Sequence, residues 1–291
     1  MIEHHDMNSN NSYILSFKCP DKVGVVAATT AFFYDHGAFI TEVANYSDPV
    51  SETFHMRCVF DDRQMNLSFD EFSEKFQIIA QDFRMTLRLR SVTKLPRVII
   101  AVSKYDHCLS VLLNKWKSGA LPADIVGVIS NHEDCSSMTD WYGLPFYHLP
   151  VTEETKPQQE QQILNVMSSL SVDLLVLARY MQILSDDLCS QLEGRAINIH
   201  HSFLPSFKGA RPYHQAYERG VKVIGATAHY VTSDLDEGPI IAQEVRSIDH
   251  EVTVSQMVHL GHDIEATALS HAVRLHCDER VHLNGQRTVI L

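Results

Sequence analysis

Hydrophobic and polar positions in the first third of the chain predict the order strand, helix, strand, strand, helix, strand. Apolar side chains alternate in the strand segments and recur at helical spacing in the helix segments. Gly37 closes the first helix, Ser68 opens the second, and Asp48-Pro49 joins the two middle strands as a hairpin. The predicted strands are Tyr13–Cys19, Phe39–Ser47, Thr53–Phe60 and Arg84–Ser91, and the predicted helices are Val25–His36 and Ser68–Asp82. This βαββαβ order predicts a split βαβ domain over residues 12–92.

A second pattern begins at Pro96, after the boundary Val92–Pro96. Continuous apolar runs, typical of strands buried on both faces, alternate with segments of helical spacing. The predicted strands are Arg97–Ser103, Asp124–Ser130, Val172–Ala178, Ala196–Ser202 and Lys222–Thr232, and the predicted helices end near Lys117 or span Lys156–Leu170 and Asp186–Leu192. This order predicts an α/β domain over residues 96–291, with an open, Rossmann-like, mostly parallel sheet.

Length and composition agree with two soluble domains. The chain has 291 residues, of which 45% are hydrophobic and 21% charged. It holds no apolar run long enough for a membrane span, and its N-terminus is too polar for a signal peptide. Its six cysteines form no Cys-x-x-Cys pair and stand among apolar neighbours. We therefore expect a cytoplasmic protein, without a membrane partner, whose cysteines are buried thiols.

Charge and missing motifs exclude several function classes. The formal net charge is −12, and no cluster of Lys and Arg offers contacts to phosphates, so we expect no nucleic-acid partner. The first strand of the second domain leads into Lys104–Cys108, which lacks the glycine-rich turn of a dinucleotide site. There is no Gly-x-Ser-x-Gly elbow for a covalent nucleophile. His107-Cys108 begins a helix where a thiolate is conceivable, but we favour a structural role.

Seventeen histidines raise the question of a metal site. His259, His262 and Glu265 follow one another at helical spacing and would suit metal ligation. The simpler interpretation is a polar face of a C-terminal helix. We expect no metal and no cofactor.

The candidate chemistry lies at Asn198 and His200. Two positions apart on a strand, their side chains point to the same face. Asp236, in the turn Asp234–Pro239, is placed to bring a carboxylate to the imidazole. An amide donor beside an imidazole suits attack on a carbonyl group, because the amide stabilises the oxyanion while the imidazole moves protons. Strand alternation turns His201 to the opposite face, which predicts a structural role.

His229 lies in the alternating strand Lys222–Thr232, on the face that it shares with Thr227 and Val231. We expect it to support the polar network near Asp236 without taking part in the chemistry.

Two longer runs resemble a known family. Residues 196–212, AINIHHSFLPSFKGARP, and residues 223–244, VIGATAHYVTSDLDEGPIIAQE, are similar to the signature of the folate-dependent formyltransferases. The run from Ile199 to Val231 resembles the branch that hydrolyses 10-formyltetrahydrofolate to formate and tetrahydrofolate, which supplies one-carbon and purine metabolism. The resemblance implies that Asn198, His200 and Asp236 are catalytic. It further implies that the folate substrate contacts Met181, Gln182, Ile183, Leu184, Thr232, Ser233 and Asp234.

Gln182 departs from many relatives, which carry a basic residue there, and this leaves the folate contacts at that position open. The interpretation of Met181, Ile183 and Leu184 as core packing also stays open. The tight loop Lys208–Pro212 is most simply turn chemistry, although Arg211 is long enough to reach an anionic group.

Two alternatives to hydrolysis stay open. One is formyl transfer to an amine such as glycinamide ribonucleotide or aminoacyl-tRNA. The transformylase branch holds its phosphorylated acceptor with a Gly-Ser-Asn loop where this chain has Lys104–Cys108, so the resemblance favours water as the acceptor. The other alternative is a sensor that binds folate and an amino acid without turnover.

The N-terminal domain has a resemblance of its own. The run PDKVGVVA, between the first strand and the first helix, is similar to the ligand-side loop of ACT domains, which have the ferredoxin-like βαββαβ order. Such domains pair edge to edge and bind a free amino acid. The resemblance implies an effector site at Asp21 and Gly24 and a homo-oligomer, a dimer or a tetramer. A domain that serves only assembly is the alternative.

Overall fold

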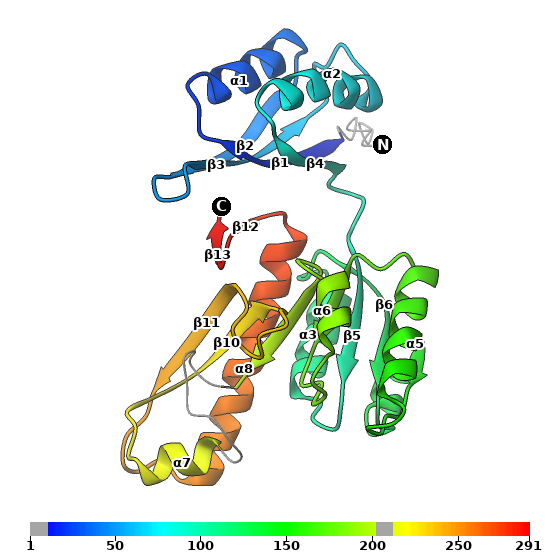
Figure 1. Ribbon diagram of the computed structural model, residues 1–291, viewed down its shortest axis with the longest axis vertical. Coiled ribbons are helices and arrows are strands. Elements are labelled where there is room, and N and C mark those ends of the chain that lie inside the picture. Colours follow the sequence, from blue (N-terminus) through cyan, green and yellow to red (C-terminus); the bar gives the residue numbers. More distant parts are fainter. Residues whose placement is uncertain (1–10, 202–211) are drawn as a thin grey trace, which may run out of the picture. The chain divides into compact units, whose positions relative to one another are not determined.

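The computed structural model describes residues 11–201 and 212–291, which form two compact units (Figure 1). The first unit runs to Lys94 and also contains residues 279–284 and 289–291, and the second contains Leu95–Asp278 and Gly285–Thr288. The chain thus crosses between the units near the predicted boundary. The C-terminal residues that join the first unit differ from our assignment of all of 96–291 to one domain.

The first unit is built on a four-stranded antiparallel sheet in the order β2-β3-β1-β4. Its helices α1 and α2 lie on one side of this sheet (Figure 1). Phe17, Phe33, Phe60, Phe72 and Phe76 fill the core between the helices and the sheet. The elements are β1 Ser12–Pro20, α1 Val25–Asp35, β2 Phe39–Asp48, β3 Thr53–Asp61, α2 Phe69–Asp82 and β4 Thr86–Ser91. The predicted ferredoxin-like order is confirmed.

Helix ends in this unit follow from local sequence. Ser68 and Glu71 form a reciprocal capping box at the start of α2, which confirms Ser68 as the N-cap. Gly37 follows the end of α1 at a φ of +67°, and a Cβ there would overlap the carbonyl oxygen of Gln64. Only glycine fits this position. Arg84, which we placed in the last strand, lies in a turn at a φ of +55°, and β4 begins at Thr86.

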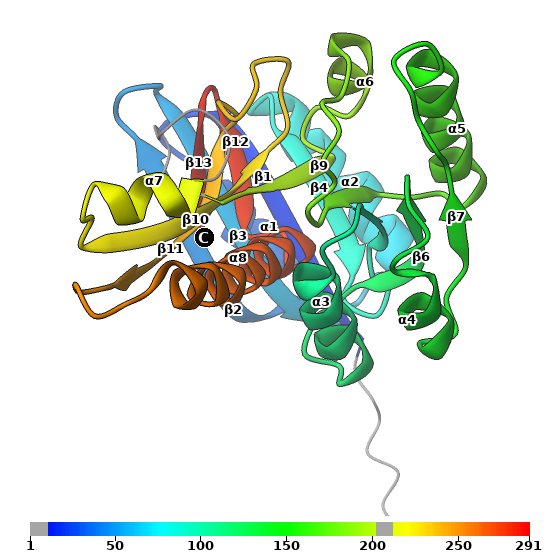
Figure 2. The same cartoon turned by 90° about the horizontal axis from the view of Figure 1, so that it is seen from below.

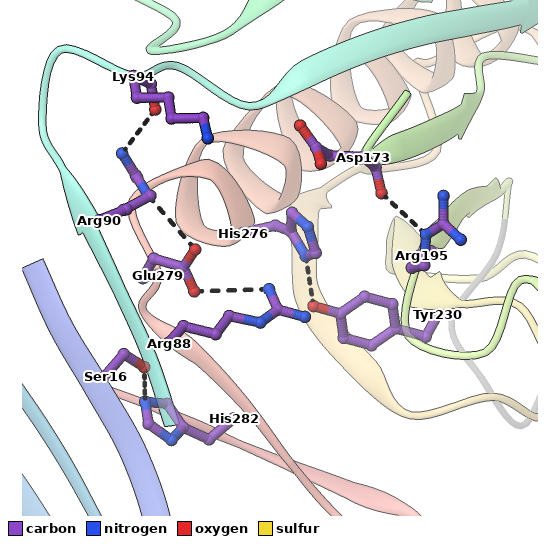
Figure 3. A network of polar contacts seen from close by, with 10 residues as sticks. All are labelled: Ser16, Arg88, Arg90, Lys94, Asp173, Arg195, Tyr230, His276, Glu279 and His282. Carbon is purple, nitrogen blue, oxygen red and sulfur yellow. Dashed lines mark hydrogen bonds and ion pairs between the residues drawn. The ribbon is translucent and has the colours of Figure 1, made fainter. Parts of the chain in front are cut away.

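The C-terminal segment of the first unit carries polar contacts to its sheet. β12, Val281–Asn284, pairs with β13, Arg287–Ile290. Glu279, just before β12, forms ion pairs with Arg88 and Arg90 of β4 at 3.5 and 3.4 Å (Figure 3). His282 is hydrogen-bonded through Nε2 to the Ser16 hydroxyl of β1 at 3.1 Å.

The second unit contains a seven-stranded sheet in the order β11-β10-β9-β8-β5-β6-β7. Strands from β9 to β7 are parallel, and β10 and β11 are antiparallel additions. Helices α5 and α6 cover one face and α3 and α8 the other (Figure 2). The strands are β5 Arg97–Val102, β6 Asp124–Ser130, β7 Phe146–His148, β8 Leu174–Leu177, β9 Ala196–His200, β10 Val223–Tyr230 and β11 Ile240–Ser247. The helices are α3 His107–Lys117, α4 Ser136–Trp141, α5 Lys156–Ser169, α6 Asp186–Gln191, α7 Pro212–Glu218 and α8 Val254–Cys277. The mostly parallel sheet is as predicted.

The buried thiols that the sequence predicts are confirmed in this structure, where all six cysteines are buried. Within the described residues, no helix combines the length and the apolar character needed to cross a membrane.

Candidate active site

A cavity of about 200 Å³ opens at the carboxyl ends of β8 and β9. Ligands of open α/β sheets bind at this edge, because the loops that follow neighbouring parallel strands meet there. Asn198, His200 and Asp236 line the cavity together. All seven predicted folate-contact residues line it as well, namely Met181, Gln182, Ile183, Leu184, Thr232, Ser233 and Asp234.

The strand register brings Asn198 and His229 together. They are direct partners in the antiparallel pair of β9 and β10, and their side chains meet at 3.4 Å between Nδ2 and Nε2. Nδ1 of His229 lies 2.9 Å from the carbonyl oxygen of Tyr230, which only accepts, so this nitrogen carries the proton. The Tyr230 hydroxyl is in turn hydrogen-bonded to His276 at 2.7 Å (Figure 3). His229 is therefore a fixed, buried support for the amide of Asn198.

Asp236 contacts every polar partner in the group. Its Oδ2 lies 3.1 Å from Nδ1 of His200, and its Oδ1 lies 3.7 Å from Nε2 of His229 and 3.5 Å from the amide nitrogen of Asn198. Burial alone would raise the pKa of this carboxyl. The hydrogen bonds and charges of His200 and His229 outweigh burial and hold the pKa of Asp236 well below its ordinary value. Asp236 is a carboxylate that orients the Nδ1 side of His200.

The turn that carries Asp236 folds back tightly on β10. Asp236 has a φ of +59°, and the backbone N–H of Tyr230 donates to the carbonyl of Pro239 at 2.9 Å. A Cβ on Gly238 would overlap the Tyr230 carbonyl oxygen and lie 3.1 Å from Nδ1 of His229. Glycine at 238 is thus a condition for placing the carboxylate beside the two imidazoles.

The prediction for His201 is wrong. Its ring does not turn away from that of His200, since the two rings stack with centroids 4.9 Å apart and both line the cavity. The alternation rule fails because β9 ends at His200, and His201 already lies in a bend. Burial, followed by the charge of Arg179, lowers the pKa of His201 to about 4. His201 is therefore a neutral neighbour of His200 at physiological pH.

The apolar residues of the cavity fall into two groups. Met181 and Ile183 are 56% and 62% exposed, so their side chains are available to a ligand. Leu184 is 9% exposed and belongs to the hydrophobic core under the sheet. Core packing thus describes Leu184, whereas Met181 and Ile183 form an open apolar wall.

Several candidate residues lie elsewhere. Asp21 and Gly24 belong to the first unit, in the turn between β1 and α1. Arg211 lies outside the described residues. The thiol of Cys108 is fully buried, and burial raises its pKa above the ordinary value, which opposes a thiolate and favours the structural role.

The interpretation of α8 as a polar surface face is wrong at Glu265, which is 0% exposed. Its carboxylate pairs with His107 at 2.8 Å and with Arg179 at 3.4 Å. His107, Cys108 and Glu265 have ligand atoms close enough for a metal ion. The guanidinium of Arg179 already supplies the positive charge, however, so the cluster suits an ion pair better than a cation site.

Sequence reasoning missed Arg179 and Glu265. Arg179 lines the cavity, and Glu265 lies behind it in α8. These residues are 86 positions apart (265 − 179), and no local spacing connects them.

Residues 96–273 match the sequence model of the formyl transferase family. The chain belongs to this family. Formyltetrahydrofolate deformylase from Corynebacterium sp. (strain P-1) is 47% identical over 98% of this chain and 100% of its own length. The crystal structure of formyltetrahydrofolate deformylase from Burkholderia mallei ATCC 23344 is also 47% identical, with a TM-score of 0.93 over 97% of this chain and 99% of that chain.

A transferase of the same family shares only the catalytic fold. Glycinamide ribonucleotide transformylase 1 from Symbiobacterium toebii is 29% identical, with a TM-score of 0.63, over 68% of this chain and 94% of that chain. Both kinds of formyl transferase family members thus use this sheet, and the nearly complete coverage distinguishes the deformylases.

Proposed function

We propose that this protein is a formyltetrahydrofolate deformylase, which hydrolyses 10-formyltetrahydrofolate to formate and tetrahydrofolate. The observation that carries the proposal is the meeting of Asn198, His200 and Asp236 in one cavity. Relatives named formyltetrahydrofolate deformylase cover nearly the whole chain and support it. The formate so released supplies one-carbon and purine metabolism.

The first step is attack of water on the formyl carbon, which places negative charge on the formyl oxygen. We assign the amide of Asn198 to this oxyanion. Its contacts to His229 and Asp236, at 3.4 and 3.5 Å, are long, so a stronger acceptor readily draws one of its hydrogens. Loss of one such donor typically lowers the rate about 100- to 1000-fold.

The proton leaves the attacking water as the carbon–oxygen bond forms. We assign Nε2 of His200 to accept it, because the carboxylate of Asp236 holds the opposite nitrogen, Nδ1, at 3.1 Å. The imidazolium that forms lies against a carboxylate that stays ionised. When the carbon–nitrogen bond breaks, the same proton passes to N10 of the folate, and formate and tetrahydrofolate are released. General acid–base help of this kind contributes roughly 100- to 10,000-fold.

The folate binds on the wall opposite the chemistry. We propose that the exposed side chains of Met181 and Ile183 cover the faces of the pterin ring. The backbone of the turn Thr232–Asp234 offers hydrogen-bonding groups to its edge, and the hydroxyl of Thr232 holds that turn by donating to the carbonyl of Asp234 at 3.1 Å. Gln182 lines the same wall as a neutral polar contact.

Formyl transfer to an amine is the competing function, because a transformylase shares the catalytic fold. A transferase must hold its acceptor so that the amine reaches the formyl carbon ahead of water. The segment Lys104–Cys108 instead packs its own side chains inward. His107 bonds Glu265, and the ring of Tyr105 lies 5.6 Å from the guanidinium carbon of Arg179. These contacts favour water as the acceptor.

One assay separates the three functions. The protein is incubated with 10-formyltetrahydrofolate, with and without glycinamide ribonucleotide, and formate and formylated nucleotide are measured. A deformylase releases formate without an acceptor, at a rate that the nucleotide does not change. Formylated nucleotide at the expense of formate would establish transfer, and binding without either product would establish a sensor.

We further propose that the first unit assembles the protein and binds an amino acid. Its edge strand β2 exposes the apolar side chains Phe39, Val43 and Tyr46, which suit pairing with a second copy in a dimer or tetramer. Gly24, at a φ of +98°, caps the start of α1, where the N-terminal backbone amides suit a carboxylate. Asp21 in the same turn offers a partner for an ammonium group. Sedimentation and amino-acid titration of the rate test both points.

The remaining partner and location assignments stay predictions. We expect turnover to survive exhaustive dialysis against a chelator, since none of the assigned steps requires a metal or cofactor. Restoration of a lost rate by one added metal ion would contradict this expectation. The net charge of −12 opposes a nucleic-acid partner, and we expect a cytoplasmic location without membrane attachment.

A further inference from the structure

A buried carboxylate lies beside the active-site cavity and has no role in the chemistry described so far. Glu265 of α8 is fully buried, and its Oε2 lies 2.8 Å from Nε2 of His107 and 3.4 Å from Nη1 of Arg179. Its Oε1 accepts the hydroxyl of Tyr213 at 2.8 Å. Gly261, one turn earlier in α8, makes this approach possible, because a Cβ there would overlap the Tyr213 hydroxyl. Four separate elements therefore converge on one carboxylate.

The carboxylate is ionised although it is buried. Burial would raise the pKa of Glu265, but the hydrogen bond from His107 and the charge of Arg179 outweigh it and lower the pKa. A buried charge is stable only when an opposite charge and hydrogen bonds compensate it. Arg179 is the permanent cation of the cluster, and Glu265 is the group that allows a guanidinium to be held there.

Arg179 connects this cluster to the cavity. It follows β8, lines the cavity with His200 and His201, and has a φ of +63°, which is uncommon for a residue with a side chain. Its carbonyl accepts the backbone N–H of Ser103 at 3.2 Å, which fixes the strained position. Within the described part of the chain, its buried Nε has no hydrogen-bond partner. The guanidinium is thus held by its charge and its backbone rather than by a full set of hydrogen bonds.

The ring stack carries this charge to the proton-transfer residue. His201 stacks on His200 at 4.9 Å, and the charged or titratable groups around His201 are Arg179, His200, Glu265 and Asp236. Arg179 and His200 oppose a proton on His201, and the two carboxylates favour one. Burial and the cationic side dominate, so His201 stays neutral.

We propose that Arg179, held by Glu265, is a positioning residue that keeps His201 uncharged beside His200. The inference rests on the proposed function, which assigns proton transfer to His200. When His200 takes the proton of the attacking water, an imidazolium next to it would oppose that uptake by like-charge repulsion. A neutral His201 removes the repulsion and still fixes the plane of the His200 ring by stacking.

The test compares Arg179→Met with Arg179→Lys. The Met variant removes the charge and leaves Glu265 uncompensated, and both changes favour a proton on His201. We expect the acid limb of the kcat profile to move to higher pH by at least about one unit, because one charge within 4–6 Å shifts a pKa by this amount. The Lys variant keeps the charge and should keep the acid limb in its original place. A loss that is equal at all pH values, or equal in both variants, would overturn the proposal.

The double variant Arg179→Met/His201→Gln tests whether His201 is the group responsible. Without an imidazole at 201 the extra acid limb should disappear, and its persistence would overturn the assignment. A direct measurement needs neither turnover nor a stable Met variant. The NMR titration of His201 in the unaltered protein, assigned with His201→Gln, should show a neutral ring down to about pH 5, below the ordinary histidine pKa. Titration near that ordinary pKa would overturn the proposal, whereas absence of formate release by the unaltered protein would contradict only the proposed function.

Discussion

Asp236 is the residue on which the polar group of the site depends. It contacts two imidazoles, His200 at 3.1 Å and His229 at 3.7 Å, and both keep it ionised. Each imidazole is in turn fixed from a second side, His229 by the Tyr230 carbonyl and His200 by the ring of His201. The carboxylate therefore has one geometry available, as electrostatic stabilisation of a transition state requires.

The first prediction concerns these side chains. Asn198→Ala, His200→Ala and Asp236→Asn should each lower kcat at least about 100-fold, because each removes stabilisation that matters in the transition state. Formate release under saturating substrate measures the effect. Glu237→Gln is the matched control, since it neutralises an exposed carboxylate next to Asp236. A triad variant as active as this control would have no part in the mechanism.

The second prediction concerns Gly238. A Cβ there would overlap the Tyr230 carbonyl oxygen and press on His229, so Gly238→Ala must shift the turn that carries Asp236. Overpacking of this kind costs about 1–3 kcal/mol of unfolding free energy. A small misplacement of Asp236 should also lower kcat by at least about ten-fold.

Urea unfolding and formate release measure both effects of the Gly238→Ala change. Glu237→Ala, at the preceding exposed position, should change neither quantity strongly. If Gly238→Ala kept both the stability and kcat of the unaltered protein, the turn would not be what places Asp236.

At this scale the sequence predicts part of the site. Asn198 and His200 share a strand, and Asp236 stands in a recognisable turn, so spacing was enough to propose that they meet. His201 was placed wrongly, because strand alternation was extended one residue past the end of β9. Arg179 and Glu265 were missed, because a pairing across 86 positions leaves no local pattern.

Pairing between elements determines how the site residues meet. Asn198 faces His229 only because β9 and β10 pair antiparallel in that register, and a shift by one residue would turn one of them to the other face. Buried strands and capped helices were predictable from apolar runs and from Ser68. The position of β12 was not predictable, because four residues of alternating character do not specify a partner sheet.

The third prediction concerns β12 in the first unit. His282 and His55 are buried, their rings lie 5.4 Å apart, and within the described residues both ring nitrogens of His55 lack a hydrogen-bond partner. Burial, together with the charges of His55 and Lys18, lowers the pKa of His282 to about 4. Burial also lowers the pKa of His55. The folded state thus prefers both rings neutral, whereas the unfolded chain takes up protons near pH 6.5.

Stability is therefore fully present above about pH 6.5 and is lost as the pH falls towards 4, by on the order of 3 kcal/mol for His282. His282→Gln retains a hydrogen-bonding group for Ser16 and should flatten the pH dependence of the unfolding free energy across this window. Urea unfolding at several pH values measures the slope. An unchanged slope in the variant would show that His282 does not couple folding to protons, and His271→Gln, at a half-exposed histidine of α8, is the matched control.

The two units of the whole molecule divide the chain unevenly. Every described residue of the cavity lies in the second unit, between Leu177 and Asp236. The chain returns to the first unit after Asp278, and residues 279–284 and 289–291 belong there. A cut that follows the sequence boundary alone would therefore leave part of the first unit attached to the catalytic unit.

The fourth prediction follows from this division. A fragment of residues 95–278 should bind tetrahydrofolate as the full chain does, because it contains all described cavity residues. It should not respond to amino acids and should sediment as a smaller species, since the proposed effector site and edge strand lie in the first unit. A longer fragment, 95–291, should bind equally but aggregate more. Its β12 would lose the sheet that buries His282 and would expose an unpaired strand edge. Isothermal titration and light scattering compare the two fragments. Weaker folate binding by 95–278 than by 95–291 would show that the C-terminal strands support the catalytic unit directly. An unchanged sedimentation of both fragments would show that assembly does not depend on the first unit.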